Sequence, residues 1–245
     1  MVTRAARELK NGEVVFVGIG LPNFACNLAR RLHAPDLVLI YEAGAVGAVP
    51  SRLPLSIGDP CLVTDSISIC SMVELFNYYL QGGLIDVGFL GGAQVDKFGN
   101  INSTVIGDYK RPKIRLPGSG GACEIAINSK KTIIILKQNK KTFPETIDFI
   151  TSPGYIDKSN QRTKYNMPGR GPALVITDFG VYHFSDKNHE MVLFEIYPNV
   201  SFDELKGNIS WDIKVIPELA KTSAPTREEL SIIREDLDPK RIHLR

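Results

Sequence analysis

The sequence predicts an α/β fold built on an open, mainly parallel sheet with helices on both faces. Residues 14–20 form an unbroken apolar run that ends in glycines, which is typical of a strand buried on both faces. Residues 22–32 carry apolar side chains at helical spacing, and residues 37–41 form a second apolar run. A strand, a helix and a strand in this order predict a right-handed crossover between parallel strands.

The other elements can be predicted in chain order. Residues 2–10 favour a short amphipathic helix that ends at Asn11-Gly12. An extended segment is expected to begin at Leu62 and Val63. Residues 71–80 predict a helix whose inward side chains are Met72, Leu75, Phe76 and Tyr79.

The C-terminal half continues with strands and two late helices. Strands are predicted at residues 84–90, 132–136, 173–177 and 191–196. The last two are expected to pair antiparallel around the turn at residues 178–180. Helices are predicted at residues 201–206 and 226–236, and Glu228 and Glu229 lie in the first turn of the second, where the helix dipole favours acids.

Composition excludes several classes of protein. The chain has 245 residues, of which 43% are hydrophobic, so a large core is expected, and we predict one domain over residues 1–245. A net charge of +2 is too small to indicate binding to nucleic acid or to an anionic membrane. The four cysteines lie far apart without a CxxC pair, so neither disulfides nor a zinc site are expected. Charged residues near the start argue against a signal peptide, and no apolar run could span a membrane, so a soluble cytoplasmic protein is expected.

Two long segments without periodicity point to a functional site. They cover about residues 43–60 and 94–114, and each follows a predicted strand. Long irregular segments in compact domains are usually functional loops, and open α/β sheets bind ligands at the carboxyl ends of their strands.

Glu42 is the candidate reactive residue in the first of these segments. It follows a buried strand and precedes Gly44 and Gly47, so its carboxylate should be partly desolvated yet reachable. The two glycines are expected to let a substrate approach the backbone. On the local pattern alone, Glu42 could equally cap a loop or pair with a lysine.

Two glycine-rich segments are candidate ligand loops. Residues 118–122, Gly-Ser-Gly-Gly-Ala, could present backbone N–H groups to an anion or a developing oxyanion, or could form only a flexible turn. Residues 18–23 resemble a dinucleotide fingerprint, but Pro22 stands near the third-glycine position and Asp36 comes early. A NAD site is therefore not expected.

Seven short motifs follow one another in fixed order. They are GIGLP at 18–22, EAGAVG at 42–47, GGAQVD at 91–96, GNINST at 99–104, IGDY at 106–109, GSGGA at 118–122 and TSPG at 151–154. Together they resemble the signatures of family I CoA-transferases, most closely the β subunits of glutaconate CoA-transferases. The resemblance extends from about residue 7 to about residue 239.

The resemblance implies a mechanism and a partner. Glu42 matches the nucleophile that carries CoA as a glutamyl-CoA thioester, and Gly118, Gly120 and Gly121 match glycines that lie against the thioester carbonyl, with Ser119 between them. It further implies a sheet fold shared with ribose-5-phosphate isomerase, and an active site formed with a homologous α subunit in an αβ hetero-oligomer. Acyl-CoA and a carboxylic acid would be the substrates, without metal or organic cofactor. Ala43 and Gly47 depart from the glutaconate pattern of serine and an acidic residue, which leaves the acid unidentified.

Several alternatives stay open. Gln94 and Asn102, with Asp96, Ser103 and Asp108, could position the substrate or could satisfy loop hydrogen bonds. Cys70 and Cys123 could act as nucleophiles, although thiols in such surroundings are usually buried. A decarboxylase or hydrolase of CoA thioesters on the same fold is the alternative enzyme class, and a ligand-sensing module is the non-enzymatic one.

Overall fold

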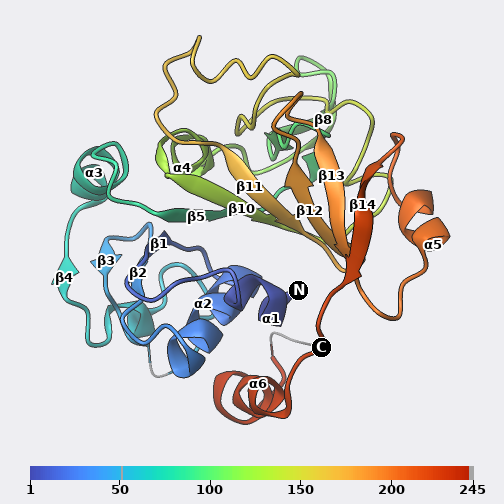
Figure 1. Cartoon of the computed structure of the whole chain (residues 1–245). Coiled ribbons are helices and arrows are strands. Elements are labelled where there is room, and N and C mark those ends of the chain that lie inside the picture. Colours follow the sequence, from blue (N-terminus) through green and yellow to red (C-terminus); the bar gives the residue numbers. More distant parts are fainter. Residues whose placement is uncertain (51, 243–245) are drawn as a thin grey trace. The chain divides into compact units, whose positions relative to one another are not determined.

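The structure is a computed structural model that describes residues 1–50 and 52–242 (Figure 1). It contains two compact units, which are described separately. The first comprises Met1–Phe89 and the C-terminal residues from Ala224 onward, and the second comprises Leu90–Ser223. The single domain expected over residues 1–245 stays a prediction, because one domain can be built from two such units.

The first unit is built on five strands in the order β5-β1-β2-β3-β4. The strands β1, β2 and β5 pair in parallel, whereas β3 and β4 are added antiparallel. The strands are β1 (Val14–Phe16), β2 (Val38–Ile40), β3 (Ala45–Val46), β4 (Ser68–Ile69) and β5 (Val87–Leu90). The helices are α1 (Val2–Ala6), α2 (Leu21–Leu32), the 3-10 helix η1 (Pro60–Val63), α3 (Met72–Glu74) with the π-helical turn η2 (Leu75–Leu80), and α6 (Arg227–Ser231) with the π-helical turn η3 (Ile232–Leu237).

The helix α2 forms the crossover between β1 and β2, as the sequence predicts. Pro22 lies in its first turn, where the missing N–H is no loss, and residues 23–29 are buried. The C-terminal helix α6 begins at the predicted place with Thr226 as its N-cap, and Glu229 completes a capping box. Glu229 also binds Arg7 of the segment after α1, with 2.6 Å between the guanidinium and the carboxylate.

Two local predictions in this unit are wrong. Leu62 and Val63 belong to a 3-10 helix and not to an extended segment, because Pro60 and the Asp59 side chain, which accepts the Cys61 N–H, start a helical turn. Met72 is 54% exposed instead of directed inward. The π-helical turn that follows changes the helical register, so that Leu75 and Leu80 provide the buried face.

The second unit contains a sheet of five strands in the order β14-β13-β12-β11-β10. The strands are β10 (Lys131–Ile135), β11 (Pro172–Ile176), β12 (Gly180–Phe184), β13 (Met191–Ile196) and β14 (Lys214–Lys221), and the helices are α4 (Ala122–Asn128) and α5 (Phe202–Gly207). Two small hairpins precede this sheet. They are β6 (Gln94–Val95) with β7 (Ile101–Asn102), and β8 (Val105–Gly107) with β9 (Pro112–Arg115).

Strand β12 was missed by the sequence prediction. The turn at residues 178–180 connects β11 to β12, and β13 then pairs antiparallel with β12 and not with β11. Strand β14 was also missed, because its side chains are largely exposed and lack an apolar alternation. The remaining predicted strands and helices are present, and those expected at residues 2–10, 14–20, 37–41 and 84–90 are shorter than expected.

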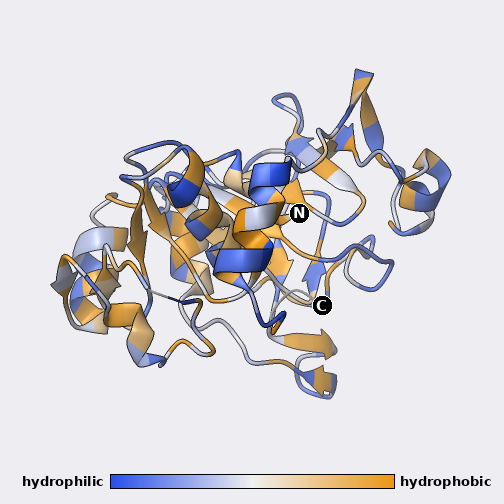
Figure 2. Ribbon diagram, turned by 90° about the horizontal axis from the view of Figure 1, so that it is seen from below, coloured by the Kyte–Doolittle hydropathy of each residue, from blue (hydrophilic) through white to orange (hydrophobic). Residues whose placement is uncertain are grey.

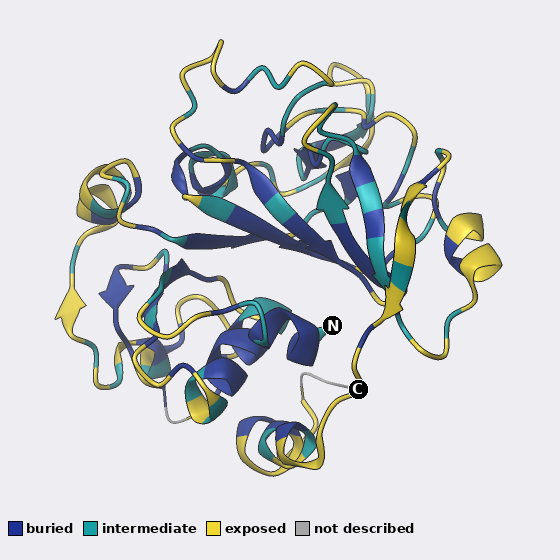
Figure 3. Ribbon diagram, viewed as in Figure 1, coloured by how far each residue is buried: buried dark blue, intermediate teal, exposed yellow. Residues whose placement is uncertain are grey.

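Burial differs from strand to strand in both units. All four residues of β5 are buried, and four of five in β10, whereas both residues of β4 are exposed (Figure 3). Figure 2 shows hydrophobic residues on several of the strands and helices. Among the described residues, no helix combines the length and the apolar character needed to cross a bilayer.

Candidate functional site

Glu42 lies at the tip of the tight hairpin between β2 and β3. The Gly44 N–H donates to the Tyr41 carbonyl at 2.8 Å, and the Tyr41 N–H donates to the Ala45 carbonyl at 3.0 Å. This pattern, with Gly44 at a φ of +108°, is a short turn closed by a glycine bulge. The hairpin therefore presents Glu42 at the end of a buried strand, where the sequence predicts a reactive group.

The glycines of the EAGAVG motif are required by packing. A Cβ atom on Gly44 would lie 2.0 Å from the Cys70 carbonyl oxygen, and one on Gly47 would lie 2.4 Å from the end of the Ile67 side chain. Neighbouring residues therefore occupy the Cβ direction of both glycines, and the expectation that a substrate approaches the backbone there stays a prediction. Substrate binding at Gly44 itself stays a prediction.

Tyr41 anchors the hairpin in the core. Its side chain is fully buried, and its hydroxyl donates to Asn23 Oδ1 on α2 at 2.8 Å. Asn27 also donates to Asn23 Oδ1, at 2.7 Å. Burial, with smaller effects from neighbouring groups, holds the pKa of the Tyr41 phenol well above its usual range. This role was not predicted from the sequence, although a tyrosine at the end of an apolar strand signals a hydroxyl that needs a partner.

The Glu42 carboxylate is not used by the surrounding fold. The residue is half-buried, and within residues 1–50 and 52–242 its side chain makes no hydrogen bond or ion pair. The alternatives that it caps a loop or pairs with a lysine therefore find no support among the described residues. A fixed carboxylate without an internal partner is available to a ligand.

The glycine-rich segment 118–121 presents three free amides. The Gly118 N–H donates to the Ser103 carbonyl at 2.8 Å, and the Ser103 hydroxyl donates to the Gly118 carbonyl at 2.8 Å. Gly118 is therefore held by the loop, and its amide is not available. The N–H groups of Ser119, Gly120 and Gly121 have no hydrogen-bond acceptor among the described residues. These three amides are the donors that could bind an oxyanion.

Arg162 holds the helix α4, which follows this segment. Its guanidinium is only 3% exposed, and burial lowers its pKa. It donates five hydrogen bonds, at 2.9 to 3.3 Å, to the carbonyl oxygens of Ala126, Ile127, Pro153, Gly154 and Gly169. A single side chain thus ties the C-terminal end of α4 to two other loops. The sequence gives no signal for this role, because the acceptors are all backbone atoms.

Gln94 and Asn102 are fully engaged inside the second unit. Asn102 is completely buried and donates to Gln94 Oε1 at 2.6 Å, while Gln94 donates to Asp148 at 2.7 Å. Asn102 Oδ1 accepts the Thr104 N–H at 2.9 Å. These contacts explain both amides without a ligand, and a role in substrate binding stays a prediction.

Cysteine chemistry and metal binding find little support. Burial raises the pKa of the Cys70 thiol, and the negative charge of Glu74 raises it further by a smaller amount. Burial and, to a smaller extent, the charge of Glu124 raise the pKa of the Cys123 thiol. Both thiols therefore stay protonated and are poor nucleophiles at neutral pH. Over the described part of the chain, no cluster of His, Cys, Asp and Glu has the arrangement of a metal site.

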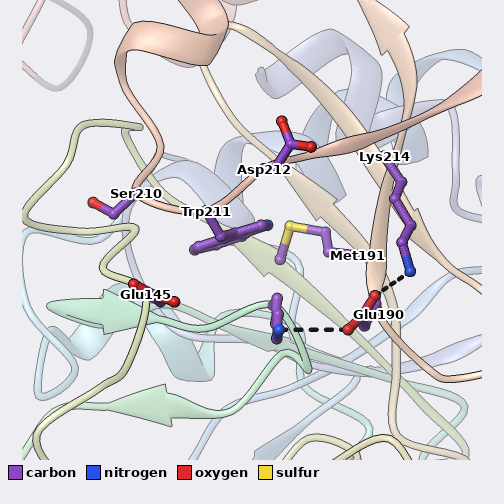
Figure 4. Close-up of a pocket in the computed structure, with 8 residues that line it drawn as sticks. Glu145, Glu190, Met191, Ser210, Trp211, Asp212 and Lys214 are labelled. Carbon is purple, nitrogen blue, oxygen red and sulfur yellow. Dashed lines mark hydrogen bonds and ion pairs between the residues drawn. The ribbon is translucent and has the colours of Figure 1, made fainter.

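A pocket of about 480 Å³ lies in the second unit (Figure 4). It is lined by Lys97, Glu145, Glu190, Met191, Ser210, Trp211, Asp212 and Lys214. Glu190 lies between Lys97 and Lys214 and forms an ion pair with each of them. The charges of Lys97, Glu190 and Lys214 are thus paired within the pocket wall. None of the predicted site residues lines this pocket.

Comparisons with known proteins identify the family. The model of the Coenzyme A transferase family matches residues 1–208. The chain is 49% identical to the β subunit of 3-oxoadipate CoA-transferase from Pseudomonas knackmussii, over 96% of this chain and 90% of that protein. It is 40% identical to the β subunit of glutaconate CoA-transferase from Acidaminococcus fermentans, over 96% of this chain and 89% of that protein.

The structural comparison confirms the predicted fold class. The crystal structure of glutaconate coenzyme A-transferase from Acidaminococcus fermentans matches with a TM-score of 0.93 and 37% identity, over 100% of this chain and 95% of that chain. The family match and both sequence identities agree with the resemblance carried by the seven motifs. The chain therefore belongs to the coenzyme A transferase family, as an enzyme subunit of the β type.

Proposed function

We propose that this chain is the β subunit of a heteromeric CoA-transferase in which Glu42 carries CoA as a glutamyl-CoA thioester. The observation that carries the proposal is the half-buried Glu42 carboxylate, fixed by its hairpin and without a partner among the described residues. Because CoA thioesters are intracellular metabolites, the proposed site of action is the cytoplasm.

The proposed reaction proceeds in balanced steps. A Glu42 oxygen attacks the carbonyl carbon of the donor acyl-CoA, and the C–S bond breaks to give a mixed anhydride and CoA thiolate. The thiolate then attacks the Glu42 carbonyl, which forms the glutamyl-CoA thioester and releases the first acid as carboxylate. The second acid reverses both steps and leaves with CoA. Covalent catalysis of this kind predicts ping-pong kinetics, with CoA as a substrate and no metal or organic cofactor required.

The amides of Ser119, Gly120 and Gly121 are proposed as oxyanion donors. Each addition to a carbonyl creates a tetrahedral intermediate whose oxygen carries the negative charge. Free N–H groups held in place before the reaction stabilise that charge without reorganisation, and one such donor is typically worth about 3 kcal/mol. The support for this assignment is that these three amides lack an internal acceptor among the described residues.

A partner subunit is proposed to cover the exposed apolar edge of the first unit. We define this apolar edge as β4 and its neighbours, with Val63, Ile67, Ile69, Met72 and Val73 exposed by 46% to 76%. An edge strand with exposed large hydrophobic side chains needs a covering partner to avoid aggregation. The edge also adjoins Glu42, because Ala45 pairs with Ile69 and the Cys70 N–H donates to Gly44. A homologous α subunit at this edge would exclude water from the thioester.

The proposed acid substrate is a short dicarboxylic acid. The names of the two relatives, 3-oxoadipate and glutaconate CoA-transferase, both denote diacids of five or six carbons. An acid of this class is therefore the first to test, with acyl-CoA donors of similar length. Among the described residues, no specific contact favours a decarboxylase or a hydrolase.

The experiment traps the intermediate on the complex with the α subunit. The complex is incubated with acyl-CoA and then with borohydride, which reduces a glutamyl thioester to an alcohol. Peptide mass spectrometry should find Glu42 modified, and activity should be lost. Glu42→Gln should abolish both transfer and trapping, because an amide cannot act as the nucleophile. Glu145→Gln, at an exposed carboxylate of the second unit, is the matched control and should retain both.

Either of two results would reject the mechanism. One is a Glu42→Gln complex that still transfers CoA at the wild-type rate. The other is an active complex in which borohydride leaves both activity and the Glu42 peptide unchanged. A complex that releases free CoA or CO₂ from the acyl-CoA without transfer would instead favour the hydrolase or decarboxylase alternative.

A further inference from the structure

A basic hairpin leads directly into the glycine-rich segment. It consists of β8, β9 and the turn between them, residues 105–115, and its exposed side chains include Lys110, Arg111 and Lys113. None of these three cations forms an ion pair or a side-chain hydrogen bond with any residue in 1–50 or 52–242. The one nearby acid in sequence, Asp108, is already used by the turn.

The hairpin is rigid at its tip. Asp108 Oδ1 accepts the backbone N–H groups of Lys110 and Arg111, both at 2.9 Å. The Arg115 guanidinium lies over the Tyr109 ring at 5.0 Å and donates to the Tyr109 carbonyl at 3.0 Å. The Tyr109 ring stacks on Phe149 with 5.3 Å between centroids. The free cations are thus displayed from a fixed backbone.

The base of the hairpin is fixed to the glycine-rich segment. The Leu116 N–H donates to the Thr104 carbonyl at 3.0 Å, and Gly118 is bound in both directions to Ser103. The distance from this base to the cations follows from strand geometry. Strand β9 covers only Pro112–Arg115, so Lys113 lies two residues, about 7 Å at about 3.3 Å per residue, from Arg115, and Lys110 and Arg111 lie in the turn beyond the strand.

We propose that Lys110, Arg111 and Lys113 bind the phosphate groups of the CoA nucleotide while the thioester lies at the free amides of residues 119–121. This inference rests on the proposed function, since it assumes that the glycine-rich segment faces the thioester. The pantetheine arm between sulfur and diphosphate has about as many bonds as four extended residues, so it spans about 15 Å. Six residues of chain, at most about 20 Å, separate Lys113 from Ser119, and the pantetheine arm covers most of that distance.

Charge complementarity supports a phosphate ligand. CoA carries a diphosphate and a 3′-phosphate, which are multiply charged acceptors for lysine and arginine. Three unpaired cations within four residues repel one another, and an anion relieves that repulsion. The lysines at 137, 140 and 141 form a second exposed basic run in the same unit, on a segment that does not lead into the glycine-rich segment, and serve as a control.

The test compares two triple variants in the complex with the α subunit. One is Lys110→Gln, Arg111→Gln and Lys113→Gln, and the other is Lys137→Gln, Lys140→Gln and Lys141→Gln, which removes the same charge. The hairpin variant should raise the KM for acyl-CoA about tenfold or more, because each exposed charge pair contributes up to about 1 kcal/mol. Its kcat should stay within about twofold of wild type, since no catalytic group changes. The control variant should leave both constants unchanged.

A truncated substrate separates phosphate binding from other effects. The same acyl group is offered as a thioester of pantetheine, which lacks every phosphate. The hairpin variant and the wild type should then have the same KM. An equal rise in KM for both thioesters would overturn the proposal, and so would an unchanged KM for acyl-CoA. If size-exclusion chromatography finds that the hairpin variant no longer assembles with the α subunit, the hairpin is a subunit contact and the proposal fails.

The outcomes also separate this inference from the proposed function. If the hairpin variant has a normal KM while borohydride still traps Glu42, the phosphate site is wrong and the transferase mechanism stands. If Glu42→Gln retains transfer, the mechanism is wrong, whatever the hairpin binds.

Discussion

Substitution of Gly44 by alanine tests whether the EAGAVG hairpin is held by packing. At a φ of +108°, an L-residue is strained by about 1–2 kcal/mol. The new Cβ would also lie 2.0 Å from the Cys70 carbonyl, so β3 and β4 must separate by about 1 Å or more. That movement breaks the 3.0 Å hydrogen bond from the Cys70 N–H to the Gly44 carbonyl, at a loss of about 1 kcal/mol. We expect Gly44→Ala to lower the free energy of unfolding by about 3 kcal/mol.

A matched control isolates the steric part of this effect. Gly12 has a φ of +80° in the same unit, but a Cβ there meets nothing within 4 Å. Gly12→Ala should therefore lose only the conformational strain, about 1–2 kcal/mol. The difference between the two variants measures the contact with Cys70.

The assay must report on the first unit. The single tryptophan, Trp211, lies in the second unit, so its fluorescence is a poor probe of the hairpin. Urea unfolding followed by circular dichroism gives the global stability, and amide hydrogen exchange of residues 41–46 gives the local one. Gly44→Ala should accelerate exchange in this segment, while Gly12→Ala should not. The reasoning is refuted if the two variants are equally stable and exchange residues 41–46 at the same rate.

Two further predictions concern the partner and the second unit. The double variant Ile67→Lys with Ile69→Lys should leave the isolated chain folded but weaken its assembly with the α subunit at least about tenfold, because charges on the apolar edge are desolvated on binding. Co-purification and sedimentation measure the assembly, and Ile150→Lys, at a 43% exposed site of the second unit, is the control that should assemble normally. Unchanged assembly of the double variant would argue against this surface. Arg162→Lys should lower the free energy of unfolding by about 3 kcal/mol in a urea titration, because an ammonium has three donors for five carbonyl acceptors, and a loss below about 1 kcal/mol would contradict that role.

Local chemistry made much of this protein predictable from the sequence. The apolar runs at β1 and β2, and the helical spacing of α2, predict a parallel crossover because a doubly buried strand and an amphipathic helix have distinct periods. The EAGAVG and GSGGA motifs predict the family and the position of Glu42 at a strand end. The acids Glu228 and Glu229 indicate a helix start, because their interaction with the helix dipole acts within the first turn.

Tertiary structure decided the features whose cause lies far along the chain. Gly44 is required by the carbonyl of Cys70, and Arg162 is positioned by five carbonyl groups from three separate segments. Likewise the Gly118 amide is occupied by Ser103, which leaves the amides of Ser119, Gly120 and Gly121 as the donors without an acceptor among the described residues. Backbone acceptors carry no residue identity, so no sequence pattern reveals them. The sequence therefore determined which groups can react, and only the folded chain decided which of them remain available.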